Sequence, residues 1–296
     1  MEINVNHSSC RNLQIRSPLL NLQGALNLRF SVSFTKQNLF QKTSSSTKSP
    51  ISPPLFRRSS TPSCSLSGNG STTEVVEVDP SLAVKNKLRE ISPELKGTSV
   101  FLVGMNSTMK TSLGKLLADV LRYYYFDSES LVQQAAGGES AAKSFKEKDE
   151  KGYRDSETEV LKQLSSMGRL VVCAGDGAVQ SPTNLAFLRY GISIWIDIPL
   201  DMVAREIENG SQCLASAIST LGSSSEVVEQ LTLLYEETRG GYATADATIS
   251  LQKVACQLGY DSVDEVTTVD MAMEVLMEIQ KLTRAKKMME AAARPF

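Results

Sequence analysis

Residues 104–111 read GMNSTMKT, and the segments on either side determine how this stretch is interpreted. The apolar run at 98–103 that precedes it has the composition of a buried strand, and residues 112–121 that follow it have helical periodicity. A buried strand, a short loop and a helix, in this order, form the usual setting of a phosphate-binding loop. We therefore take residues 104–111 as the segment around which the fold is built.

The stretch matches part of the phosphate-binding motif G-x-x-x-x-G-K-[ST]. Gly104, Lys110 and Thr111 fit the motif, but Met109 stands where the second glycine is expected. If this position requires a positive φ, a residue with a Cβ costs about 1–2 kcal/mol there. We expect weakened nucleotide binding, and we interpret Lys110 and Thr111 as remnants of a functional loop.

The rest of the chain alternates predicted strands with predicted helices, which is typical of an α/β protein with a mostly parallel sheet. The predicted strands are 98–103, 123–126, 170–174, 192–198 and 246–250, and the main predicted helices are 84–91, 112–121, 153–167, 181–189, 200–207, 226–239 and 267–291, with further helical segments before 145. Ligands of parallel sheets bind at the carboxyl ends of the strands. The unusual segments 104–111, 127–129 and 175–177 all follow strands, so we expect them at one edge of the sheet.

The N-terminal stretch differs in composition from the rest. Residues 3–73 contain eight Lys or Arg, no Asp or Glu, and many Ser, Thr and Pro. This composition predicts an organellar transit peptide at 1–73 that forms no core, the alternative being an ordinary disordered tail. A short lead-in segment at 74–94 and one domain at 95–291 are expected to follow.

Composition excludes several classes of function. Residues 74–296 carry 23 basic and 32 acidic residues, a net charge of −9, which argues against a nucleic-acid partner. The apolar runs are too short to span a bilayer, so we expect a soluble protein. The single histidine, His7, lies in the predicted leader, which excludes Ser-His and Cys-His catalysis in the mature chain. The five cysteines have no paired spacing.

Ordered motifs from 95 to 285 resemble the shikimate kinase family. They comprise the nucleotide loop at 101–114, the acidic motif at 126–129, the segment from Phe145 to Glu157, the glycine-rich loop at 174–179, the strand end at 195–199, and the residues around 234–235 and 245–246. The resemblance implies a P-loop, nucleoside monophosphate kinase-like fold, with three layers and a central parallel sheet. In an active member it also implies ATP and Mg²⁺.

The resemblance assigns roles residue by residue. Nucleotide-binding positions would be Gly104, Lys110, Thr111, Ser112 and Arg205, and substrate-cleft positions would be Asp127, Glu129, Arg154, Gly175 and Gly177. Thr111 and Asp127 would contact a metal only if Mg²⁺ is bound. Lys110 and Glu129 would be catalytic only in an active enzyme.

Several of these assignments have plainer alternatives. Asp127 is equally a helix N-cap, and Glu129 a first-turn acid stabilised by the helix dipole. Arg154 either binds a carboxylate or pairs with Glu157 one turn later. Arg205 either packs on adenine or is a solvated helix residue.

The chain departs from the family pattern where the family binds anions. Ser107 and Met109 replace loop glycines, Asp176 replaces the middle glycine of a triple-glycine loop, and Leu231 replaces a substrate-binding arginine. The lid residues 213–215 include no arginine, and the stretch from 206 to 238 contains six glutamates and no Lys or Arg. Phosphoryl transfer depends on cations around the moving group.

These departures predict an inactive family member with a non-catalytic, binding or regulatory role. The resemblance extends to plant plastid shikimate kinase-like proteins, which implies a location in the chloroplast stroma and a role in chloroplast biogenesis. The partner would be an unidentified protein or small molecule, with no nucleic acid, no membrane span and no cofactor. The alternative is an ATP-dependent kinase, with Mg²⁺, that phosphorylates an alcohol group of shikimate or of another hydroxylated metabolite.

Overall fold

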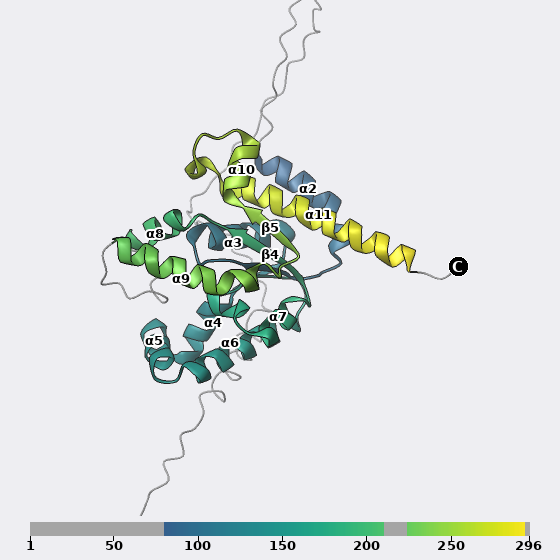
Figure 1. The fold of residues 1–296 in the computed structure, drawn as a ribbon. Helices are drawn as coiled ribbons and strands as arrows, with labels where there is room; N and C mark the ends of the chain where they lie inside the picture. The colour runs from purple at the N-terminus through teal and green to yellow at the C-terminus, as the bar shows by residue number, and fades with distance from the viewer. Residues whose placement is uncertain (1–79, 210–223, 294–296) are drawn as a thin grey trace, which may run out of the picture.

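The computed structural model describes residues 80–209 and 224–293 (Figure 1). The predicted leader at 1–73 and the lid residues 213–215 lie outside these residues, so the expectations for them stay predictions. In the described part of the chain, no helix is both long enough and apolar enough to cross a membrane.

A five-stranded, all-parallel sheet forms the centre of the molecule, with the strand order β2-β3-β1-β4-β5. Its strands are β1 (Val100–Val103), β2 (Tyr124–Asp127), β3 (Leu170–Cys173), β4 (Ile192–Asp197) and β5 (Ala247–Ser250). All five predicted strands are present, and the predicted parallel α/β architecture is confirmed. β1 and β3 are buried along their whole length, as their apolar sequences predict.

Helices surround the sheet in two outer layers (Figure 1). The helices are α2 (Pro80–Leu95), α3 (Thr108–Leu121), α4 (Ser128–Ala136), α5 (Glu139–Lys148), α6 (Glu150–Ser165), α7 (Pro182–Leu188), α8 (Leu200–Glu208), α9 (Ser224–Tyr242), α10 (Leu251–Leu258) and α11 (Thr268–Ala292), with short 3₁₀ turns η1 (Asp176–Val179) and η2 (Val263–Glu265). α11 packs along α2 and α3 on one side, and α6 packs against α7 and η1 on the other.

Several helix bounds differ from the predictions, and one helix was not predicted. α2 spans 80–95 where 84–91 was predicted. α3 begins at Thr108, four residues before the predicted start, so Lys110 lies inside the helix. α10 was not predicted, because its eight residues follow β5 directly and no turn residue separates the two patterns.

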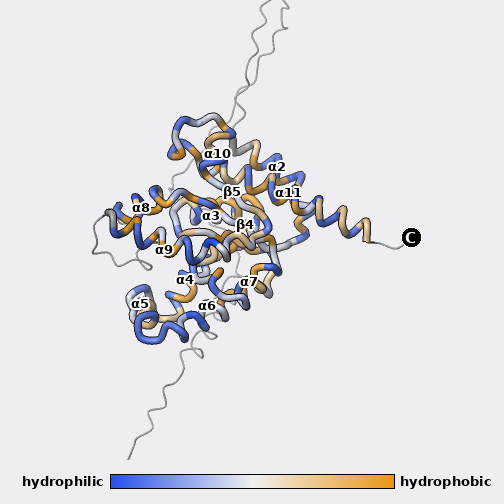
Figure 2. Tube along the Cα trace, in the orientation of Figure 1, coloured by the Kyte–Doolittle hydropathy of each residue, from blue (hydrophilic) through white to orange (hydrophobic). Residues whose placement is uncertain are grey.

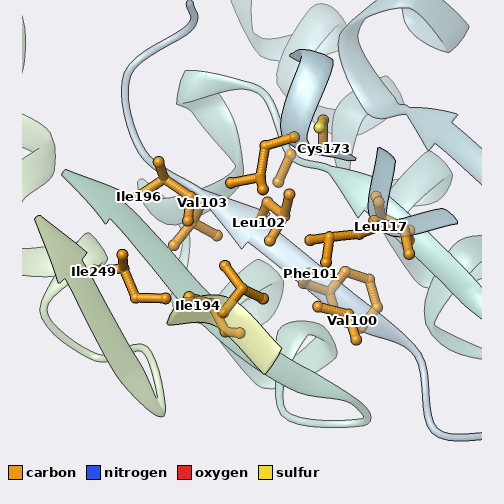
Figure 3. Packing of buried hydrophobic residues seen from close by; sticks show 14 of the residues in the cluster. Val100, Phe101, Leu102, Val103, Leu117, Cys173, Ile194, Ile196 and Ile249 are labelled. Carbon is orange, nitrogen blue, oxygen red and sulfur yellow. The ribbon is translucent and has the colours of Figure 1, made fainter. Parts of the chain in front are cut away.

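The core lies on both faces of the sheet, where apolar residues gather (Figures 2 and 3). Leu102 and Ile194 pair across β1 and β4, and both are fully buried. The lead-in helix α2 takes part in this core, because its residues Ile91 and Leu95 are 0% and 1% exposed. Burying a side chain of that size stabilises the fold by about 1.5–3 kcal/mol.

Gly104 ends β1 and turns the chain into the loop. Its φ is +128°, and a Cβ there would collide with the backbone oxygen of Ile196 on β4. The glycine is therefore required by backbone geometry, whether or not the loop binds phosphate.

We predict that Gly104→Ala lowers the free energy of unfolding by about 2 kcal/mol or more, because of the positive φ and the collision with β4. Gly240→Ala is the matched control, since a Cβ at this position of α9 meets nothing within 4 Å. The control should be neutral or should stabilise by up to about 1 kcal/mol. Urea denaturation measures both, and equal effects would contradict the assignment.

Candidate functional site

Three loops meet at the carboxyl ends of β1, β2 and β3, and Asn106 joins them. The side-chain amide of Asn106 donates to Glu129 Oε2 at 2.6 Å, and its backbone N–H donates to Asp176 Oδ1 at 3.2 Å. The segments 104–111, 127–129 and 175–177 therefore do lie together, as the strand order predicts. Asn106 was missed, because position 106 is unspecified in the motif.

Lys110 is enclosed by the protein, with 1% of its surface exposed. Its ammonium nitrogen donates to Gly104 O at 2.7 Å, Asn106 Oδ1 at 2.8 Å and Ala174 O at 2.9 Å. An ammonium group has three N–H donors, so all three are used. To bind a phosphate, Lys110 would first have to release one of these oxygens.

The N-terminal end of α3 has partners from within the chain. Ser107 is extended, with φ −160°, and its hydroxyl accepts from Lys110 N at 3.1 Å as an N-cap. The backbone N–H of Thr108 donates to Glu206 Oε2 at 2.8 Å, and the Thr108 hydroxyl donates to the other carboxyl oxygen of Glu206. Thus N–H groups that commonly bind phosphate at a helix start are already bonded.

The strain expected at Met109 is absent. Among the described residues, the non-glycine residues with positive φ are Lys96, Arg122 and Arg169, so Met109 is not one of them. It lies in the first turn of α3, and its sulfur accepts a weak hydrogen bond from Thr268 at 3.8 Å. The condition for the penalty, a positive φ, is not met, because the helix begins earlier than predicted and includes this position.

In the acidic motif, Asp127 is a helix N-cap and Glu129 is a first-turn acid, which are the structural alternatives considered for these two residues. Asp127 ends β2 and caps α4, accepting from Ser130 N at 2.9 Å. Glu129 lies in the first turn of α4 and accepts from Asn106. No group of three or more His, Cys, Asp or Glu able to hold a metal is found within 80–209 and 224–293. The metal roles of Thr111 and Asp127 stay predictions.

Arg154 forms an ion pair with Glu157 at 2.9 Å and a longer one with Glu150 at 3.6 Å. The Glu157 side chain is 12% exposed, and burial raises its pKa while the charge of Arg154 opposes that rise. Gly177 allows this pair to approach the backbone, because a Cβ there would collide with both side chains. Gly175 similarly packs on Glu129, to which a Cβ would come within 3.3 Å.

Asp176 is half-buried beneath the loop. Its Oδ1 accepts from the Asn106 N–H and, at 3.5 Å, from the hydroxyl of Tyr242, whose ring stacks on Trp195 at 5.8 Å between centroids. Burial raises the pKa of the Asp176 carboxyl, and the charge of Lys110 is the largest effect opposing that rise. The role of Tyr242 was missed, since it lies 66 residues from Asp176 in the chain.

Lys146 is a further cation close to this group of side chains. Lys146 on α5 lies over the ring of Tyr153 at 5.6 Å, and its charge acts to lower the pKa of both Glu157 and Asp176. It was missed because position 146 is unspecified in the motif that runs from Phe145 to Glu157.

The remaining predicted positions take no part in the contacts around Asn106, Lys110 and Asp176 described above. Arg205 is exposed on α8 and pairs with Asp264 at 3.2 Å and Asp201 at 3.4 Å. Ser112 is exposed on α3, and the Thr111 backbone continues the helix by donating to Ser107 O at 3.2 Å. Leu231 is 1% exposed and belongs to the core.

This arrangement does not fit a bound ATP. The lysine donors and the N–H groups of residues 106, 108 and 110 are bonded to protein oxygens, so a triphosphate would have to displace these acceptors. Asp176 and Glu206 would also place carboxyl groups beside its charges.

Comparisons with known proteins agree with the fold. The sequence pattern of the family described as Shikimate kinase matches residues 106–265. The chain is 55% identical over 237 residues to "Probable inactive shikimate kinase like 1, chloroplastic" of Arabidopsis thaliana, covering 79% of this chain and 82% of that protein. It is 40% identical over 205 residues to "Shikimate kinase 2, chloroplastic" of Oryza sativa subsp. japonica, covering 69% of this chain and 67% of that one.

A solved structure resembles the fold. It is the shikimate kinase from Acinetobacter baumannii in complex with shikimate, with a TM-score of 0.52 and 22% identity, covering 66% of this chain and 97% of that chain. The predicted P-loop kinase-like fold is thereby confirmed.

We predict that Lys110→Met lowers the free energy of unfolding by about 3–5 kcal/mol, because it removes a buried cation and leaves carbonyl groups and Asp176 without it. Lys115→Met on the same helix is the control, since Lys115 is exposed and only lies over the Tyr125 ring at 5.9 Å. Its loss should cost about 1 kcal/mol or less. Denaturant unfolding of both variants tests this, and similar losses would show that Lys110 is not structural.

Asp176 should make stability depend on pH. Its folded-state pKa lies above the ordinary value of about 4, so the folded state holds the proton more tightly than the unfolded chain. This contribution is complete below that ordinary value and is lost as pH rises through the folded-state pKa. As pH rises from about 4 through the folded-state pKa, the free energy of unfolding of the natural protein should therefore fall relative to that of Asp176→Asn. The exposed Asp155→Asn is the control, and parallel profiles for the natural protein and Asp176→Asn would refute the prediction.

Proposed function

This chain belongs to the shikimate kinase family, and from that premise we propose that it is a non-catalytic member with a binding or regulatory role. The observation that carries the proposal is the state of Lys110, whose three donors bind Gly104, Asn106 and Ala174 instead of remaining available to a phosphate. The name of the Arabidopsis relative, a probable inactive kinase-like protein, agrees with it.

Loss of cations supports the same conclusion. The position of a family substrate arginine is occupied by the core residue Leu231. The sequence from 206 to 238 has no Lys or Arg, so it supplies no arginine to the moving phosphoryl group. In related phosphoryl-transfer systems such an arginine accelerates the reaction by about 10³–10⁵.

We place this role in the chloroplast. Two observations support the location. The leader predicted at 1–73 is basic and has no Asp or Glu from residue 3 on, and the names of the plant relatives describe them as chloroplastic. The stroma is the proposed compartment, and chloroplast biogenesis is the proposed process, in line with the group that the sequence resembles. The partner would be a protein or a small molecule recognised by the domain that follows the leader.

A kinase is the second candidate, with ATP and Mg²⁺ as its cofactors. The observation that favours it is the substrate side of the cleft, where Arg154 remains paired with Glu157 and Lys146 adds a cation. Lys110 and Glu129 would then be the catalytic residues, Thr111 and Asp127 the metal ligands, and a shikimate-like alcohol the acceptor.

Titration of the full chain with ATP and Mg²⁺ in a calorimeter separates these functions. We expect no binding at millimolar ATP and no phosphorylation of shikimate, while a chloroplastic shikimate kinase such as the rice relative serves as a positive control in the same assay. Micromolar ATP binding would revive the kinase candidate. Turnover with shikimate would refute the non-catalytic function.

A further inference from the structure

We infer that Asp176 and Glu206 act as built-in substitutes for phosphate oxygens and hold the nucleotide loop closed. This inference rests on the proposed function and deepens it, because it names what occupies the old nucleotide position. It starts from the disagreement between a family that implies ATP and a loop whose donors are already bonded.

Glu206 uses both of its carboxyl oxygens on one residue at the start of α3. One oxygen accepts the Thr108 N–H at 2.8 Å and the other accepts the Thr108 hydroxyl. A free N–H in the first turn of a helix is a donor that favours a negative partner. Glu206 supplies that partner from α8, 98 residues further along the chain.

Asp176 supplies a second partner from inside the protein. It accepts the N–H of Asn106, the residue whose side chain also binds Lys110. Asp176 lies near enough to Lys110 for the lysine charge to lower the pKa of the Asp176 carboxyl, although burial raises that pKa more. A glycine at 176, as in the family pattern, would offer no side-chain oxygen to the Asn106 N–H and no carboxyl charge near Lys110.

The carboxyl groups of Asp176 and Glu206 accept the N–H groups of the residues before and after Ser107. The hydroxyl of Ser107 itself accepts the N–H of Lys110. Backbone N–H groups at 106, 108 and 110 thus all have protein acceptors. Backbone N–H groups and a lysine are also the donors with which a phosphate-binding loop cradles a nucleotide. The carboxyl groups of Asp176 and Glu206 therefore take the place of the external anion at these donors.

The experiment compares the full chain with the variant Asp176→Gly/Glu206→Ala, using inorganic pyrophosphate as the probe in isothermal titration calorimetry. We expect the double variant to bind pyrophosphate at least about tenfold more tightly than the natural protein. Glu206→Ala alone, at a surface position, should give a smaller gain and remains informative if the double variant does not fold. Glu208→Ala on the same helix is the control, and it should match the natural protein.

Two outcomes would overturn the inference. One is a folded Glu206→Ala or double variant whose pyrophosphate affinity equals that of the natural protein. The other is tight pyrophosphate binding by the natural protein itself. Turnover of ATP and shikimate, measured on the natural protein in parallel, tests the proposed function separately. If the natural protein shows no turnover and the variants bind pyrophosphate no more tightly than it does, the non-catalytic function stands and this mechanism fails.

Discussion

The ammonium of Lys110 and its three oxygen acceptors are the contact on which the rest of this site depends. The acceptors come from the end of β1, from the loop residue Asn106 and from Ala174 after β3, so one side chain joins two central strands to α3. A buried charge is tolerated only when it is fully bonded and balanced. In this protein the lysine of a phosphate-binding motif has a structural explanation that requires no ligand.

The shared edge of the sheet explains how the fold can be kept while the phosphate-binding chemistry of its loops is lost. A parallel sheet brings its loops together whatever they contain, because its strand ends share one edge. Phosphate chemistry needs positive groups and free N–H donors there, whereas stability needs only that each buried polar group has a partner. Carboxyl side chains meet the second requirement and work against the first. Asp176, held by Asn106 and Tyr242, does both.

Much of the fold could be predicted from the sequence, because periodicity and apolar runs are local. The five strands, their parallel direction and the gathering of three loops all followed from such patterns. The state of the site could not be predicted in the same way. Thr108 and Glu206 are 98 residues apart; Thr108 is an unspecified position of the motif, and Glu206 lies outside it. Met109 was misjudged for a related reason: the expected strain depended on where α3 begins, which periodicity places only within a few residues.

The packing of the first described helix limits where the predicted leader could be cut off. α2 lies outside the family match at 106–265, yet its Val84 and Ile91 are buried, and its Glu90 and Glu94 accept hydrogen bonds from Gln280 and Thr283 of α11 at 3.3 and 3.2 Å. A processing protease that cut within α2 would strip α11 of its neighbour and expose apolar surface. The leader predicted at 1–73 ends upstream of this helix, so its removal would leave this packing intact.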